Sequence, residues 1–149
     1  MDRAIIVCTP YSVRAGIVEK LLDELRNTIE YKIILRKRAR LNVADVRAMY
    51  PQLVSAPFFP RIIECLTEGD AEYVLIMANR IHKKINAVKG KFRYDDGKIL
   101  ATGLRAKLQK DDKSFEFIFH STDSNDESDK IGIRLFGRKY AVAKTILQS

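Results

Sequence analysis

The apolar positions of this chain form short runs that switch between strand and helix periodicity. Ala4–Cys8 is a continuous apolar run of strand length, and Thr9–Pro10 ends it. Ser12 is placed to cap the helix that follows. The apolar stripe of that helix consists of Ile17, Leu21, Leu22 and Leu25. Tyr31–Ala39 alternates between an apolar and a largely basic face, which predicts a half-exposed strand.

The middle of the chain predicts two helices and a strand. Asn42 is expected to cap a short helix whose apolar face ends at Tyr50. Pro57–Pro60 breaks the chain and suits the first turn of the next helix, which Gly69 follows. Glu72–Ala78 is apolar enough to be a buried strand.

The last third of the chain begins with a helix that Asn79 is expected to cap. Gly90–Gly103 is polar, basic and contains glycine, so we expect a long surface loop. Phe115–Phe119 alternates as a strand does, and Ser124 is placed to cap a final helix that reaches about Phe136.

The order of these elements predicts the fold class. Without the short middle helices it is β-α-β-β-α-β, which indicates an α+β protein with a ferredoxin-like βαββαβ sandwich. In this fold an antiparallel sheet has helices packed on it, and we expect them on one face. A length of 149 residues suits a single core, and no repeat or linker divides the chain, so residues 1–149 are expected to form one domain.

Composition narrows the classes of function. The net charge of +8 favours polyanionic partners, namely nucleotides, nucleic acid or acidic surfaces. No apolar run approaches the roughly 18 residues of a membrane span, and the start is too short and too acidic for a signal peptide, so no membrane partner is expected. Cys8 and Cys65 lie in apolar surroundings, which suits buried thiols and a cytoplasmic location. No Cys/His spacing indicates a metal site.

His120 is the strongest candidate for chemistry. It directly follows the aromatic strand Phe115–Phe119, and Ser121–Ser124, a cluster of hydroxyl and carboxylate residues, comes next. The chain has only two histidines, and an imidazole can act as a nucleophile or a base near neutral pH. The other histidine, His82, lies on a basic helix and is expected to be solvated.

Several short motifs fall in a consistent order along the chain. They are Thr9–Val13, Tyr50, Ala56–Pro60, Gly69, Gly90, Gly103–Arg105 and His120–Ser124. Together they resemble the nucleoside diphosphate kinase family, whose hallmarks are K-P-D-x-V, a tyrosine ahead of P-F-F, T-I-R-G-D and H-G-S-D-S. The resemblance extends over roughly residues 3 to 136.

The resemblance implies an activity and roles for particular residues. Members of the family transfer the γ-phosphate of a nucleoside triphosphate to a nucleoside diphosphate, and by resemblance His120 carries the phosphoryl group between the two half-reactions. Phe58 matches the aromatic residue that stacks on the base, and Arg105 matches an arginine that binds phosphate. Tyr50 matches a tyrosine beside the histidine, and Thr122 keeps a serine hydroxyl among the nucleotide-binding groups.

The resemblance also implies the partners. Mg²⁺ arrives on the nucleotide, without a dedicated cage of protein ligands, and family members form homo-oligomers. Nucleoside di- and triphosphates, and further copies of this chain, are therefore the expected partners.

The sequence departs from the family pattern at several positions around the phosphates and the histidine. A family lysine is Thr9 here, and a second phosphate-binding arginine is Asn86. The other departures are Phe92 for a threonine, Phe117 for an asparagine, Ser121 for a glycine and Ile131 for the glutamate that orients the histidine.

Other residues of this chain are candidates to replace the lost groups. Lys89, Lys91 and Arg93 lie in or beside the basic loop and are candidate phosphate cations. Glu116 shares a strand face with His120, and Asp129 lies near the position of the lost glutamate, so either is a candidate to orient the imidazole.

Two alternatives to an active kinase remain open. The first is a catalytically weakened or inactive nucleotide-binding pseudoenzyme of the same fold, acting as a scaffold. The second is a nucleic-acid or ribonucleoprotein binder that uses the basic surface, including Arg36–Arg40.

Overall fold

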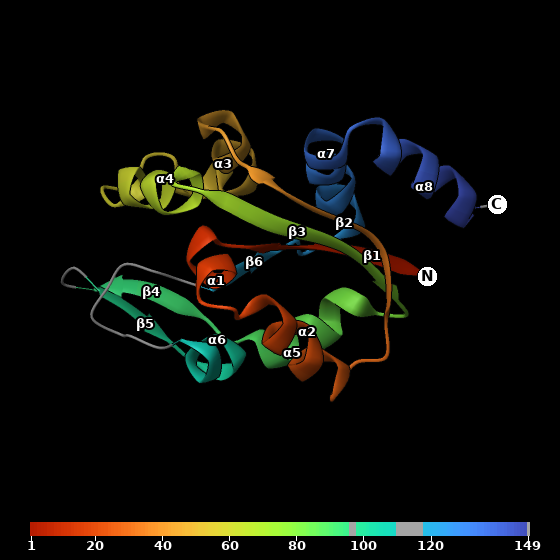
Figure 1. Ribbon diagram of the computed structural model, residues 1–149, viewed down its shortest axis with the longest axis horizontal. Coiled ribbons are helices and arrows are strands. Elements are labelled where there is room, and N and C mark those ends of the chain that lie inside the picture. Colours follow the sequence, from red (N-terminus) through yellow and green to blue (C-terminus); the bar gives the residue numbers. More distant parts are fainter. Residues whose placement is uncertain (96–97, 110–117, 149) are drawn as a thin grey trace.

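A four-stranded antiparallel sheet forms the centre of the protein (Figure 1). The computed structural model describes residues 1–95, 98–109 and 118–148, without the side chains of residues 92–95, 98–99 and 148. The strands lie in the order β2-β3-β1-β6. Their bounds are β1 Asp2–Cys8, β2 Lys32–Arg40, β3 Asp70–Ala78 and β6 Phe119–Ser121. The ferredoxin-like antiparallel sheet predicted from the sequence is therefore confirmed.

Helices cover both faces of this sheet, so the expectation of helices on one face was wrong (Figure 1). One face carries α2 Val18–Arg26, α5 Ile81–Lys89 and α6 Gly103–Leu108, and the short α1 Pro10–Arg14 precedes them. The other face carries α3 Val43–Met49, α4 Phe59–Thr67 and α7 Asn125–Phe136, after which α8 Arg138–Gln148 ends the chain.

The sequence of β1 explains why both faces need cover. Ile5 and Val7 enter the core under α3, α4 and α7, whereas Ala4, Ile6 and Cys8 enter the core under α2 and α5. A strand that is apolar on both of its sides is buried on both faces of a sheet. The uninterrupted apolar run was the signal for two helical layers.

A two-stranded hairpin occupies most of Gly90–Gly103, where a loop was expected. It consists of β4 Phe92–Asp95 and β5 Lys98–Ala101. At its base Gly90 and Gly103 cross with φ of +75° and +60°, and a Cβ on Gly90 would lie 1.8 Å from the Thr102 carbonyl oxygen. The polar and basic residues of this segment had indicated a loop, whereas within the described residues β4 and β5 pair with each other. Of the predicted strand Phe115–Phe119, residues 115–117 lie outside the described residues.

Capping was predicted correctly at two helices and wrongly at two others. Asn42 caps α3 in a reciprocal pair with Asp45, and Ser124 caps α7. Ser12 was expected to cap the helix that contains Leu21 and Leu25, but it lies inside the short α1, which Thr9 caps, and α2 begins after Ile17 without a side-chain cap. The α5 helix begins after Arg80, whose φ is +55°, instead of after a capping Asn79.

Asp129 joins β1, α7 and α8. Its carboxylate accepts hydrogen bonds from Arg3 Nε at 2.6 Å, Tyr140 Oη at 2.6 Å and Lys144 Nζ at 2.7 Å. The hydrogen bond from Arg3 holds the pKa of Asp129 well below its ordinary value. The Asp129 carboxylate therefore connects β1, α7 and α8 by hydrogen bonds, and the suggestion that it orients His120 was wrong. Gly132 allows this arrangement, because a Cβ there would lie 2.3 Å from the Tyr140 ring.

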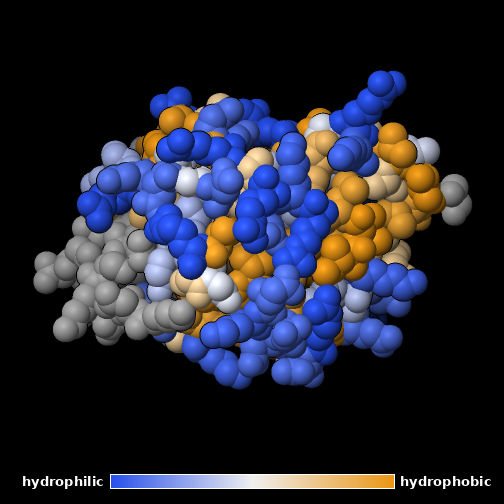
Figure 2. Space-filling view, viewed as in Figure 1, coloured by the Kyte–Doolittle hydropathy of each residue, from blue (hydrophilic) through white to orange (hydrophobic). Residues whose placement is uncertain are grey.

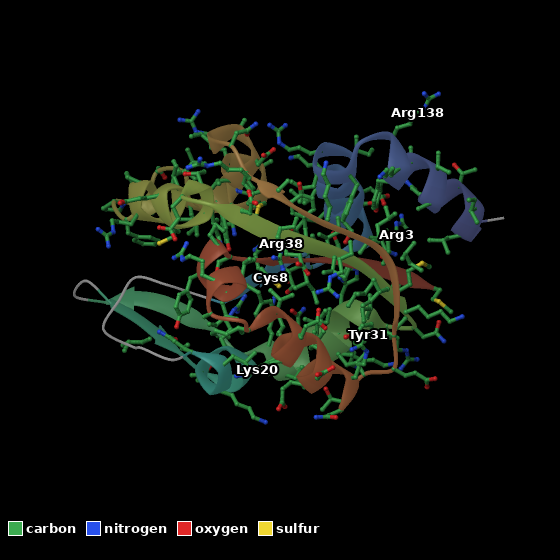
Figure 3. The ribbon with its side chains drawn as sticks, in the orientation of Figure 1. Arg3, Cys8, Lys20, Tyr31, Arg38 and Arg138 are labelled. Carbon is green, nitrogen blue, oxygen red and sulfur yellow. The ribbon has the colours of Figure 1, made fainter. Side chains whose placement is uncertain are left out.

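An apolar groove of about 480 Å³ runs between α8 and the edge strand β2. Ile34 and Leu35 line one side, and Val142 and Ile146, which are 53% and 65% exposed, line the other. Figure 2 shows hydrophobic residues gathered on this side of the molecule, and Arg138 extends outward at the start of α8 (Figure 3).

Among the described residues, no helix is long and apolar enough to cross a bilayer.

Replacing Asp129 with asparagine should destabilise the protein by about 1–3 kcal/mol, because Arg3 and Lys144 lose a charged acceptor. The pKa of Asp129 lies below 3.8 in the folded state. Its contribution is therefore present above about pH 4 and is lost as the pH falls further. Urea denaturation at pH 7 and below pH 4 measures both effects. The exposed Asp126→Asn in the same helix should change little, and an equal effect of both variants would contradict this account.

Candidate active site

His120 lies in the middle of β6, opposite Val7 of β1, and its side chain is almost entirely buried. The ring of Tyr50, from the end of α3, packs edge-on against the imidazole at a centroid distance of 4.6 Å and an angle of 65°. Tyr50 is itself buried, so one side of His120 faces a rigid aromatic surface.

Glu127 supplies the carboxylate that faces His120. Its Oε1 lies 3.5 Å from Nε2 of His120, which is longer than an ordinary hydrogen bond, so the two interact mainly by charge. The same carboxylate accepts the backbone N–H of Asp123 at 2.8 Å, and the backbone N–H of Glu127 bonds to the Ser124 side chain.

Glu127 was not predicted from the sequence, because the family glutamate aligns with a different position. That position is Ile131, which is fully buried in the core. Glu127 lies one helical turn earlier on the same face, since residues i and i+4 share a face. Ser124 and Glu127 have the spacing of a capping box, and this motif turns the glutamate back toward the end of β6. The other candidate, Glu116, lies outside the described residues.

The surroundings of His120 favour the neutral imidazole. Burial lowers the pKa of His120, and the positive charges of Arg105 and Lys89 lower it further, against the opposing effect of Glu127. For Glu127, burial acts to raise the pKa, but the contact with His120 and the hydrogen bond from Asp123 outweigh it and hold the pKa below its ordinary value. At neutral pH the site therefore combines a neutral imidazole with an ionised carboxylate.

Lys89 brings a cation to the same strand. Its Nζ donates to Ser121 Oγ at 3.0 Å and contacts Asp123 Oδ1 at 3.2 Å, and the side chain is 15% exposed. A cavity of about 430 Å³ opens beside it and is lined in part by Asn86 and Lys91. Lys91 is exposed, and the side chain of Arg93 lies outside the description.

Arg105 is buried and engaged with the backbone. It donates to the carbonyl oxygens of Gly90 at 2.8 Å and Phe119 at 3.3 Å, and its guanidinium lies 5.0 Å from the centre of the Phe119 ring. Burial lowers the pKa of Arg105. In this arrangement the side chain ties the base of the hairpin to β6.

The remaining predicted residues lie in the scaffold around the site. Thr122 is buried, and its hydroxyl accepts the backbone N–H of Ile5 at 2.9 Å and bonds to Ser128. Thr9, at the position of the lost lysine, is buried and caps α1. Phe58 precedes α4 and is partly buried against the core that includes Tyr50. Phe117 and the side chain of Phe92 lie outside the described residues.

The structure thus brings His120, Tyr50 and Glu127 into contact, with Lys89 and Arg105 near enough to act on the imidazole by charge. Within the part of the chain that is described, no group of three or more His, Cys, Asp or Glu side chains is arranged to hold a metal ion.

Comparison with known proteins identifies relatives of this chain. Residues 2–140 match the family model for nucleoside diphosphate kinase. The nucleoside diphosphate kinase of Campylobacter fetus subsp. fetus (strain 82-40) is 26% identical over 69 residues, which cover 46% of this chain and 50% of that protein. That of Thermobifida fusca (strain YX) is 23% identical over 90 residues, 60% of this chain and 66% of that protein. The chain thus spans about half to two thirds of the length of these relatives.

Solved structures show the same fold. The nucleoside diphosphate kinase of Halobacterium salinarum in complex with CDP superposes with a TM-score of 0.71 at 17% identity, covering 87% of this chain and 86% of that one. The enzyme of Borrelia burgdorferi, a transition-state mimic with bound vanadate and ADP, superposes with a TM-score of 0.69 at 12% identity, covering 87% and 83%.

Two substitutions should move the pKa of His120 in opposite directions. Glu127→Gln removes the carboxylate that raises it, so the pKa should fall further, whereas Lys89→Met removes a cation and should raise it. NMR titration of the imidazole protons measures both shifts, with Asp126→Asn as the control. Shifts in the same direction, or none in either variant, would contradict the described geometry.

Proposed function

This chain belongs to the nucleoside diphosphate kinase family, and we propose that it transfers the γ-phosphate of a nucleoside triphosphate to a nucleoside diphosphate through a phosphohistidine on His120. We further propose that residues 1–149 act as a single kinase domain. The observation that carries the proposal is the contact of Glu127 with Nε2 of a buried, neutral His120. An ionised carboxylate there compensates for the loss of the family glutamate at Ile131.

The contact supports a separate role for each ring nitrogen. Glu127 favours a proton on Nε2, which leaves the lone pair of Nδ1 for attack on the γ-phosphorus. As the P–N bond forms, the P–O bond to the nucleoside diphosphate breaks, and that product leaves with the bonding electrons. The ring then carries a positive charge that Glu127 stabilises. In the second half-reaction a terminal oxygen of another nucleoside diphosphate attacks the phosphorus, and Nδ1 leaves as a neutral imidazole nitrogen.

Phosphoryl transfer needs positive charge near the transferred group. Lys89 supports this role because its ammonium already lies beside Ser121 and Asp123, next to the reacting histidine. It would replace the cations lost at Thr9 and Asn86. Lys91 and Arg93 are weaker candidates for the same role. Mg²⁺ would enter on the nucleotide and neutralise phosphate oxygens.

Of the other residues predicted to lie in the nucleotide site, Tyr50 and Phe58 are placed to take part, whereas the polar groups of Arg105 and Thr122 already have partners within the protein. Tyr50 restricts the orientation of the imidazole by packing against it. Phe58 is half-buried at the start of α4, and its partly exposed ring would stack on the base. Arg105 would have to release the Gly90 carbonyl oxygen before it could bind a phosphate, and the Thr122 hydroxyl is already used by Ile5 and Ser128.

Two observations favour the pseudoenzyme alternative. His120 is only 7% exposed, and Arg105 is engaged by backbone carbonyl oxygens. A protein fixed in this state would lack turnover.

The nucleic-acid alternative gains less support. Arg36 pairs with Glu19 and Glu72, and Arg38 also pairs with Glu72, so part of the basic strand is neutralised internally.

We also propose a cytoplasmic location, as free thiols such as the buried Cys8 suit a reducing compartment.

The proposed reaction predicts that radiolabelled ATP with Mg²⁺ gives an acid-labile label on the protein, which added nucleoside diphosphate removes. His120→Ala should abolish the label, whereas Glu127→Gln and Lys89→Met should slow its formation by about 10-fold to 100-fold. Lys83→Met, an exposed lysine on α5, is the matched control for Lys89. Nucleotide binding without any label would instead support the pseudoenzyme, and full labelling of His120→Ala would exclude His120 as the carrier.

We propose that copies of the chain assemble through the apolar groove between α8 and β2, because exposed apolar patches commonly mark interfaces. Ile146→Asp places a charge in this groove and should convert the assembly to monomers, whereas Lys83→Asp on α5 should not. Light scattering during gel filtration measures the mass. A wild-type protein that is monomeric at high concentration would refute the proposal.

A further inference from the structure

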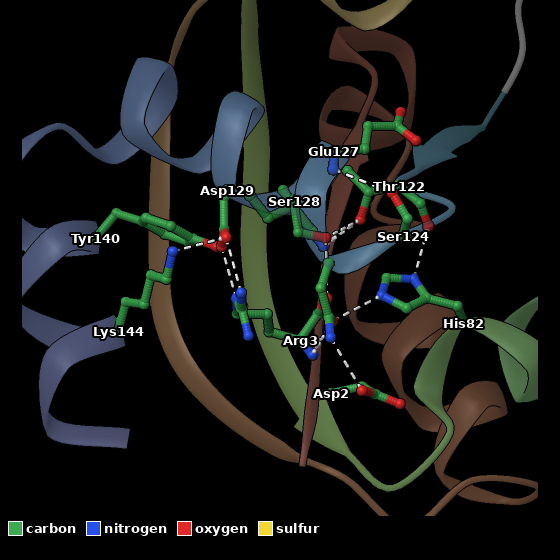
Figure 4. Close-up of polar contacts among 12 residues, drawn as sticks. Asp2, Arg3, His82, Thr122, Ser124, Glu127, Ser128, Asp129, Tyr140 and Lys144 are labelled. Carbon is green, nitrogen blue, oxygen red and sulfur yellow. Dashed lines mark hydrogen bonds and ion pairs between the residues drawn. The ribbon is translucent and has the colours of Figure 1, made fainter. Parts of the chain in front are cut away.

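His82, expected to be a solvated side chain, is half-buried and bridges three parts of the protein (Figure 4). It projects from α5 toward the turn that follows His120. Its Nδ1 lies 3.2 Å from the carbonyl oxygen of Thr122, and its Nε2 lies 3.1 Å from Oδ1 of Asn125. Neither Thr122 nor Asn125 is on the helix that carries His82.

Both atoms that face the His82 ring are hydrogen-bond acceptors. The Thr122 atom is a carbonyl oxygen. The Asn125 amide has only one orientation that fits its surroundings, because Oδ1 accepts the backbone N–H of Arg3 at 3.0 Å and Nδ2 donates to the Asp2 carboxylate at 3.0 Å. An imidazole with hydrogen on both nitrogens donates to both acceptors, and one with a single hydrogen donates to only one of them.

The two acceptors lie on the segment that separates His120 from Glu127. Thr122 comes two residues after His120, and Asn125 is the first residue of α7, two residues before Glu127. The Thr122 backbone N–H donates to the Ile5 carbonyl oxygen, and the Thr122 hydroxyl accepts the Ile5 N–H, so one side of this turn is held on β1. Two side chains of α5 reach this turn: His82 contacts Thr122 and Asn125, and Lys89 contacts Asp123 Oδ1 at 3.2 Å.

We propose that His82 is a positioning residue that holds the turn Thr122–Asn125 in place and thereby sets the separation of Glu127 from His120. No part of His82 needs to touch a nucleotide. The hydrogen bonds of His82 support the positioning role by themselves. The effect of His82 on the reaction rate rests on the proposed phosphotransfer through His120.

The proposal predicts how His120 responds when His82 is changed. Without His82 the turn loses its contacts at Thr122 and Asn125, so it gains freedom and Glu127 spends less time beside Nε2 of His120. Because Glu127 raises the pKa of His120, that pKa should fall in His82→Ala and, less strongly, in His82→Gln, which keeps one donor. The direction is the same as for Glu127→Gln.

NMR titration of His120 tests the geometric part directly. The chain has two histidines, so the His82 variants leave a single imidazole to observe. The exposed Lys83→Gln, on the same helix, is the matched control and should titrate as the wild type does. An unchanged or raised midpoint in both His82 variants would overturn the proposal, whatever their activity. His82→Gln keeps most of the side-chain volume and serves if His82→Ala does not fold.

Kinetics test the consequence for the reaction. His82→Gln should lower kcat by about 10-fold with little change in KM, because misplacement by a fraction of an ångström slows a transfer without removing binding groups. In a Glu127→Gln background the same substitution should have almost no further effect, since it acts through Glu127. Losses that multiply in the double variant would show a general structural role and overturn the proposal.

The two measurements separate this inference from the proposed function. If the wild-type protein forms no phosphohistidine, the proposed function fails, but the NMR titration of the single and double variants still decides the role of His82. If phosphotransfer occurs and His120 titrates identically with and without His82, only the positioning role fails.

Discussion

The burial of one imidazole beside one carboxylate is the constraint on which the site depends. His120 lies almost fully inside the protein, packed against Tyr50, and desolvation lowers its pKa, which favours the neutral ring that the proposed nucleophile requires. Burial also makes the ring costly to charge unless a partner is near. Glu127 provides that partner at 3.5 Å, and the fold must hold it there. The sheet pairing of β6 with β1, the cap at Ser124 and the Asp129 network all fix the start of α7 relative to His120.

Much of the fold could be predicted from the sequence because its signals are local. The apolar runs of β1 and β3 and the caps at Asn42 and Ser124 each act over a few residues, and the order of elements then leaves few arrangements of the sheet. The second helical layer was missed although the two-sided apolar character of β1 indicated it. The β4–β5 hairpin was missed because the polar and basic residues and the glycines of this segment are typical of a loop.

The site was harder to predict because it depends on contacts between distant segments. His120 and Tyr50 were identified from motifs, and their rings are in contact. Glu127 was missed because a helical face allows a carboxylate to move by one turn while the motif position becomes the buried Ile131. His82 was read as a surface residue because its partners, Thr122 and Asn125, lie about forty residues away in the sequence. Family motifs indicate the histidine proposed to react, whereas helix periodicity and the hydrogen-bond network indicate the residues that surround it.

The most direct test of the account is to map the phosphoryl group after a single turnover with ATP and Mg²⁺. Peptide mass spectrometry identifies the modified residue, and phosphorus NMR of the labelled protein distinguishes the two ring nitrogens. Because Glu127 contacts Nε2, the account predicts one phosphoryl group on Nδ1 of His120, which a nucleoside diphosphate removes. A group on Nε2, on Ser121 or on any residue other than His120, or no modification of a protein that binds nucleotide, would contradict it.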